Sequence, residues 1–136
     1  MFEILEHTAD IGFRAWGRSR EEMFENAALA LESVALDVEE VEPRTVYPIA
    51  ATGDDEASLL VNWLSEVLFY LDGRRVAMRR FRVDLLTSSQ IVGQGWGEPR
   101  ESERPRPKLV VKGVTYHQLT IARTKDGWSA DVYLDI

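Results

Sequence analysis

Two acidic side chains near opposite ends of the sequence offer the clearest prospect of chemistry. Asp10 lies in the polar segment 7–12, and Asp135 is the next to last of 136 residues, beside the main-chain carboxylate of Ile136. Both segments look like strands or strand ends, so three carboxylates converge if the two ends of the chain meet. Such a cluster repels itself unless a cation binds within it or a proton is shared. A site for a divalent cation is therefore the first hypothesis, because carboxylate oxygens select Mg²⁺, Ca²⁺ or Mn²⁺.

The local sequence leaves ordinary structural roles open for both acids. Asp10 comes two residues before Gly12, a pattern in which an aspartate often caps its own backbone in a turn. Asp135 ends a segment in which Val132 and Leu134 share one face, so it also fits an exposed strand terminus. Each segment alone is compatible with a purely structural carboxylate.

Four other polar residues are functional candidates. His7 and His117 are the only histidines and belong to no HxH, HxxxH or HExxH motif, so each is interpreted as a hydrogen-bonded structural residue. Lys112 lies among β-branched residues, where it either faces solvent or supplies a cation for a phosphate or a carboxylate cluster. Glu98 is a loop acid that becomes a ligand only if its loop folds over the site. The sequence has no nucleophile elbow, Walker P-loop or GxGxxG motif, so no enzyme class is indicated.

Two helices must help to position these residues. The first is predicted to start at Ser19, whose hydroxyl should accept from the amide of Glu22 while the Glu22 side chain returns to the cap. Apolar residues then recur at helical spacing over 23–35, and many of them are alanines that allow close packing on a sheet. The second helix is predicted to start near 54–56 and to end in a left-handed cap at Gly73.

The rest of the chain is predicted to form strands. The segments with strand patterns are 13–17, 45–51, 76–86, 90–96, 109–124 and 128–134, and 109–124 is expected to form either one long bent strand or two. In 76–86, residues 81, 83 and 85 are expected on one face and residues 80, 82 and 84 on the other. The pair Asp126-Gly127 predicts a hairpin before the last strand, and 97–108 is expected to be a long loop. Two helices among about seven strands joined mostly by short turns indicate an α+β fold. We expect one compact domain over 1–136, with two helices packed on a mainly antiparallel β-sheet.

The charge and cysteine content narrow the class of protein. The formal net charge is −7 and cysteine is absent, which excludes a disulfide scaffold, thiolate zinc sites and a cysteine nucleophile. An acidic chain is also a poor general binder of nucleic-acid phosphates. Basic runs in 74–82 and 100–112 and acidic runs in 37–42 and 54–56 are either solvated faces or surfaces for a charged partner. With no N-terminal signal pattern and no apolar stretch of about 20 residues, we expect a soluble intracellular protein.

Several motifs, taken together and in chain order, resemble the archease family. They are 7–12 with Ala15 and Gly17, 59–71, 97–98, 111–117 and 134–136. The resemblance covers the whole chain. Each motif is modest alone, and the combination is specific.

The resemblance implies an accessory protein and not an independent enzyme. Archeases are protein cofactors of the GTP-dependent tRNA-splicing RNA ligase, which joins 2′,3′-cyclic-phosphate or 3′-phosphate ends to 5′-hydroxyl ends. They promote guanylylation of the ligase's active-site histidine, restore multiple turnover and broaden nucleotide use. The partner implied is therefore the ligase with its GTP, in the cytoplasm, with nucleic acid contacted at most through the ligase and no membrane contact.

The resemblance also implies where the family's site falls in this chain. By motif match, a divalent metal ion (Ca²⁺, Mg²⁺ or Mn²⁺) would be held by Asp10, Asp135 and the Ile136 carboxylate. The family's functional lysine corresponds to Lys112. Supporting positions around the metal are expected among the matched motifs at His7, Glu98, Thr115 and His117.

The sequence is also compatible with three other functions. A chaperone-like interaction module would have no metal role. A metal-dependent hydrolase built on Asp10 and Asp135 is less favoured, because no base or nucleophile accompanies them. A direct RNA-binding module is disfavoured by the net charge of −7.

Overall fold

The computed structural model of this protein describes residues 1–6 and 10–136. Within these ranges its main elements, in chain order, are β1 (Phe2–Glu6), β2 (Ile11–Gly17), α1 (Arg20–Ala35), β3 (Thr45–Thr52), α2 (Glu56–Leu68), β4 (Val76–Leu86), β5 (Gln90–Pro99), β6 (Gly113–Thr124) and β7 (Gly127–Asp135). Two short helical turns, η1 (Val38–Glu40) and η2 (Phe69–Gly73), follow α1 and α2 respectively. The α+β class and the antiparallel pairing expected from the sequence are confirmed.

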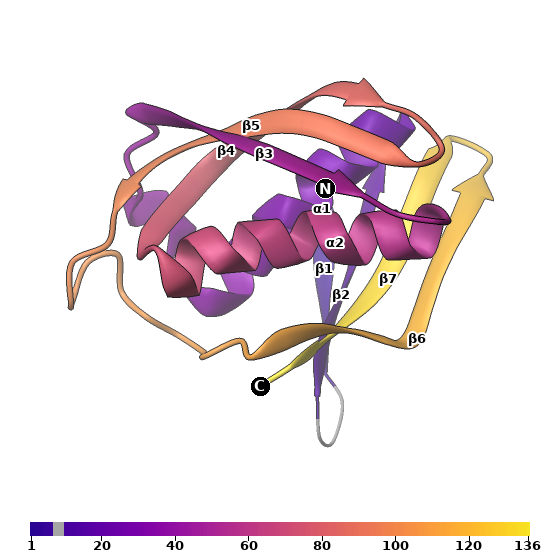
Figure 1. The fold of residues 1–136 in the computed structure, drawn as a ribbon. Helices are drawn as coiled ribbons and strands as arrows, with labels where there is room; N and C mark the ends of the chain where they lie inside the picture. Colours follow the sequence, from indigo (N-terminus) through magenta and orange to yellow (C-terminus); the bar gives the residue numbers. More distant parts are fainter. Residues whose placement is uncertain (7–9) are drawn as a thin grey trace.

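The strands form two antiparallel sheets with the two helices between them (Figure 1). The four-stranded sheet has the order β1-β2-β7-β6, and the three-stranded sheet has the order β3-β5-β4. Helix α1 contacts β2 and β4, while α2 contacts β3 and β6, so each helix touches both sheets. Each sheet therefore has one face against the helices and an outer face that neither helix covers.

The helix layer explains the many alanines of the first helix. Ala27, Ala28 and Ala30 are fully buried, and short side chains let α1 lie close to both sheets. The two helices are joined by the indole of Trp63, which is fully buried and donates to the carbonyl of Phe24 at 3.0 Å. That bond satisfies the one polar group of a large core side chain.

The start of each helix is fixed by a side-chain cap. The Glu22 amide donates to the Ser19 hydroxyl at 3.1 Å, as predicted. The Glu22 carboxylate accepts instead from the Arg18 amide at 3.2 Å, so the predicted return bond to Ser19 is not the one formed. At α2 the reciprocal pair is complete between Asp55 and Ser58.

The end of α2 differs from the prediction. Helix α2 ends at Leu68 and widens into the π-helical turn η2, and Gly73 does not have a positive φ. The π-helical turn extends through Gly73, and the residue in the left-handed conformation is Arg75, with φ 58°. No helix in the described residues is long and apolar enough to cross a bilayer.

Two strands depart from regular alternation. In β4 the register shifts between Met78 and Arg80 and again between Val83 and Leu85. The second shift turns Leu85 outward, 46% exposed, so the prediction that it shares a face with Phe81 is wrong. The predicted strand 109–124 begins at Gly113, and its pairing with β7 is irregular between Thr115 and Thr120.

Candidate functional site

The register of β2 and β7 brings the two acidic ends of the chain together. Ile11 pairs with Leu134 and Gly12 with Tyr133. Continuing this register by one residue puts Asp10 opposite Asp135. The first and last aspartates of the sequence therefore lie at the same end of the four-stranded sheet.

Strand β6 brings Lys112 to the same end. Gly113 pairs with Asp135, and the Lys112 amide donates to the carbonyl of Asp135 at 2.7 Å. Ile136 follows Asp135 and is 39% exposed. Three neighbouring strands thus deliver Asp10, Asp135, Ile136 and Lys112 to one place, which we call the acidic end.

Strand alternation assigns the acids to the outer face of the sheet. Phe13 on β2 and Leu134 on β7 are fully buried against the helices. Side chains alternate along a strand, so Asp10 and Asp135 belong to the opposite, outer face. Asp135 is exposed and Asp10 is partly buried. A partner protein can therefore reach both carboxylates.

The donors at the acidic end are all oxygens. Among the described residues, no group of three or more His, Asp or Glu side chains lies close enough to hold a metal ion. The oxygen donors placed at the acidic end are the side-chain carboxylates of Asp10 and Asp135, to which the resemblance adds the Ile136 carboxylate as an expectation. Such a set suits Mg²⁺, Ca²⁺ or Mn²⁺ and is unlike the nitrogen and sulfur ligands preferred by zinc.

The other predicted positions divide between the two sheets. The Thr115 hydroxyl donates to the carbonyl of Tyr133 at 3.2 Å and accepts from the amide of exposed His117, so it braces β6 against β7 beside the acidic end. Glu98 lies on β5 in the three-stranded sheet, where it accepts from the Glu42 amide at 2.8 Å. It is not brought to the acidic end. His7 lies outside the described residues.

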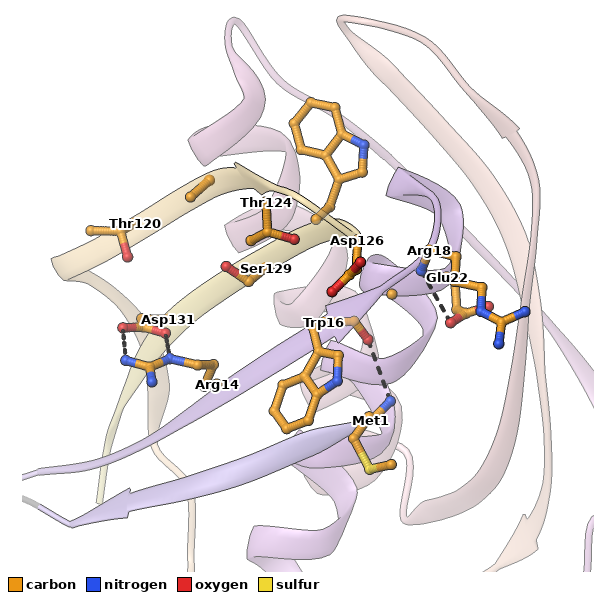
Figure 2. A pocket seen from close by; sticks show the side chains of 13 residues that line it. Met1, Arg14, Trp16, Arg18, Glu22, Thr120, Thr124, Asp126, Ser129 and Asp131 are labelled. Atoms are coloured by element: carbon orange, nitrogen blue, oxygen red, sulfur yellow. Dashed lines mark hydrogen bonds and ion pairs between the residues drawn. The ribbon is translucent and has the colours of Figure 1, made fainter.

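The outer face of the four-stranded sheet also carries a cavity of about 770 Å³ (Figure 2). Trp16, 37% exposed, forms part of its wall. Arg14 and Asp131 form a bidentate ion pair in it, with N···O distances of 2.7 and 3.0 Å. The bonds to Asp131 raise the pKa of Arg14. We call this hollow the Trp16 pocket.

A tyrosine ring separates the acidic end from the Trp16 pocket. A Cβ atom added at Gly12 would lie 2.7 Å from the ring of Tyr133, so that ring lies across the glycine. Gly12 is needed here because a larger residue would displace the tyrosine. Sequence reasoning did not identify the pocket, although the alternation of Arg14 and Trp16 with buried neighbours already indicates that both face outward.

Comparison with known proteins places the chain among proteins of similar length. A model of the Archease protein family (MTH1598/TM1083) matches residues 2–136. "Protein archease" of Methanosarcina barkeri is 42% identical over 139 residues, covering 99% of this chain and 95% of that protein. "Protein archease" of Sulfurisphaera tokodaii is 35% identical over 136 residues, covering 99% and 98%.

Solved structures agree with this similarity. The solution structure of Methanobacterium thermoautotrophicum protein 1598 has a TM-score of 0.85 and 36% identity, over 99% of this chain and 98% of that one. The crystal structure of a Thermotoga maritima archease, described as a possible chaperone, has a TM-score of 0.65 and 21% identity, over 97% and 94%. The latter similarity concerns the fold alone.

Proposed function

The chain belongs to the archease family, and from this premise we propose that it activates a GTP-dependent RNA ligase in the cytoplasm and is not itself an enzyme. In this proposal it promotes guanylylation of the ligase's active-site histidine and sustains multiple turnover in tRNA splicing and RNA repair. Asp10, Asp135 and the Ile136 carboxylate hold a divalent cation, and Lys112 acts beside them.

The convergence of Asp10, Asp135 and Lys112 at one exposed end of the four-stranded sheet supports this proposal. In guanylylation, the ligase histidine forms a bond to the α-phosphorus of GTP and pyrophosphate leaves. A bound divalent cation offsets negative charge on such phosphates. The acidic end contributes oxygen ligands and a cationic side chain at an accessible end of the sheet, and the pairing of β2, β7 and β6 sets their positions.

A guanylylation assay with the cognate ligase tests the proposal. Wild-type protein is expected to stimulate formation of the ligase–GMP adduct, whereas Asp135→Asn should lose roughly tenfold or more of that stimulation, because a charged ligand is removed. Asp10→Asn and Lys112→Ala should act in the same direction. Asp84→Asn is the matched control, since Asp84 is an exposed aspartate on β4 of the three-stranded sheet, away from the acidic end. Equal stimulation by the wild type and the Asp135 and Asp10 variants would refute a role for the acidic end.

Direct metal binding provides the second measurement. Calorimetric titration with Mg²⁺, Ca²⁺ and Mn²⁺ should give weaker binding for Asp135→Asn. Adding one residue after Ile136 should weaken it too, because the carboxylate becomes a peptide amide. If the ligase is stimulated equally by all variants and no cation binds, a chaperone-like interaction module without a metal role is the better description.

A further inference from the structure

The acidic end and the Trp16 pocket lie on the same outer face of the four-stranded sheet. Asp135, Asp131 and Ser129 alternate along β7, and Ser129 and Asp131 line the pocket. Ser129 lies six positions before Asp135 along the strand, which corresponds to about 20 Å. A partner protein that binds the acidic end therefore lies next to the outer face that carries the Trp16 pocket.

The backbone of Trp16 is hydrogen-bonded on both sides at the wall of the pocket. Its amide donates to the Met1 carbonyl at 2.9 Å, and its carbonyl accepts from the Asn26 side chain at 2.7 Å. The indole is nevertheless 37% exposed on a sheet face where polar side chains are the norm. A large aromatic side chain on a fixed backbone loses little entropy on binding, which is why tryptophans are enriched among residues that dominate protein interfaces.

The charges around the pocket indicate what kind of group it accepts. The lining includes two arginines, Arg14 and Arg18, and three acids, Glu22, Asp126 and Asp131. Arg14 is neutralised by its bidentate pair with Asp131. The ammonium group of Met1 also lines the pocket, so positive and negative groups are equal in number and the lining offers no net positive charge to the phosphates of a nucleic acid.

The pocket lining also includes uncharged hydrogen-bonding groups. Thr120, Thr124 and Ser129, on β6 and β7, add hydroxyl groups to the lining of the pocket. An aromatic wall with a few neutral hydrogen-bonding groups suits an apolar or aromatic side chain carried on a peptide segment, because the hydroxyls can bond its backbone. A cavity of about 770 Å³ has room for one such side chain and its neighbours.

We propose that the Trp16 pocket is a docking site for an uncharged peptide segment of the partner ligase, anchored by an apolar or aromatic side chain. This inference rests on the proposed function, because the partner is the ligase activated by the acidic end. The pocket supplies affinity, and the acidic end, about 20 Å along the same face, supplies the activating groups.

Binding of the full chain to the ligase, measured by calorimetry or biolayer interferometry, tests the proposal. Trp16→Ala should raise the Kd roughly tenfold or more, as expected for an interface tryptophan. Ser129→Arg, which fills the pocket without removing an anchor, should weaken binding similarly. Trp96→Ala is the matched control and should leave the Kd unchanged, since Trp96 lies on β5 with Arg80 stacked on it at 4.6 Å. Thermal unfolding of each variant verifies that it is folded.

Each other result has a defined meaning. If wild-type protein stimulates the ligase and both pocket variants bind it as tightly as wild type, the docking site is wrong and the proposed function stands. If the wild type neither binds nor stimulates the ligase, both are wrong. If the pocket variants change only self-association or only binding to single-stranded RNA, the occupant is a second copy or a nucleotide, and the proposal is overturned.

Discussion

Glu32 is a fully buried carboxyl group on α1, between the two sheets. Its Oε1 accepts a hydrogen bond from the Met78 amide at 3.1 Å. Burial raises the pKa of Glu32 to about 8, against the opposing effects of the Met78 bond and the Arg100 guanidinium. Among the described residues its Oε2 has no hydrogen-bond partner. The group is therefore mostly protonated at neutral pH, which spares the core a buried negative charge.

This pKa predicts how stability depends on pH. Between the ordinary value of 4.5 and about 8, the folded protein keeps a proton on Glu32 that the unfolded chain releases. The free energy of unfolding should therefore fall as pH rises through this range, by about 1.4 kcal/mol per pH unit from this group. Glu32→Gln, which keeps the acceptor for Met78 and cannot ionise, should lack this slope. Urea unfolding at several pH values in the range measures both proteins, and parallel profiles would contradict the prediction.

At the level of residues, strand pairing decides what the sequence leaves open. The meeting of Asp10 and Asp135 was one of several readings of two strand ends, and the β2–β7 register places them at the same level. Glu32 was not singled out, because a glutamate on a helix is normally solvated. Its burial follows from a helix that has a sheet on both sides, which the pattern of one helix does not reveal.

The helix α1 and the strand β4 are joined by two carboxyl groups. Glu25 and Glu32 lie two helical turns apart, so they point in nearly the same direction. Glu25 accepts from the Val83 amide at 2.8 Å, as Glu32 does from Met78. Both amides stand next to a register shift of β4. The carboxyls thus bond strand amides where the sheet's own ladder is interrupted.

Removing the partly buried member of this pair, Glu25, should loosen β4 locally. Glu25→Ala leaves the Val83 amide without its acceptor and should lower the free energy of unfolding by about 1 kcal/mol, while Glu25→Gln keeps most of it. Amide hydrogen exchange should become faster at Val83. Glu66→Ala, at an exposed glutamate of α2, serves as the control for losing a surface acid. Unchanged exchange at Val83 would mean that the bond contributes nothing to the strand.

At the level of elements, hydrophobic periodicity predicted the presence of helices and strands better than it predicted their ends and the faces of their side chains. The strand 76–86 was predicted with its observed bounds, yet Leu85 faces outward. Strict alternation cannot anticipate a shifted register whose support comes from Glu25, on a helix far away in the sequence. Gly73 illustrates the same limit, since the π-helical turn moves the left-handed residue to Arg75.

The whole molecule consists of two sheets on opposite sides of a helix layer, so their outer faces point away from each other (Figure 1). The alternation of buried and exposed residues predicted that helices cover a sheet, but pairing between distant strands decides that there are two sheets. The candidate functional features therefore lie on one side of the molecule. The acidic end and the Trp16 pocket share the outer face of the four-stranded sheet, whereas Trp96 and the arginines stacked on it lie on the other sheet.

This arrangement predicts that docking and activation can be separated. Ligase stimulation measured against protein concentration should keep its maximum in Trp16→Ala but need roughly tenfold more protein to reach half of it. Asp135→Asn should do the reverse, lowering the maximum at an unchanged half-saturating concentration. Because about 20 Å of strand lies between the two positions, their free-energy effects should add in the double variant. A lowered maximum in Trp16→Ala would mean that the indole acts on the chemistry of the acidic end and does not merely hold the partner.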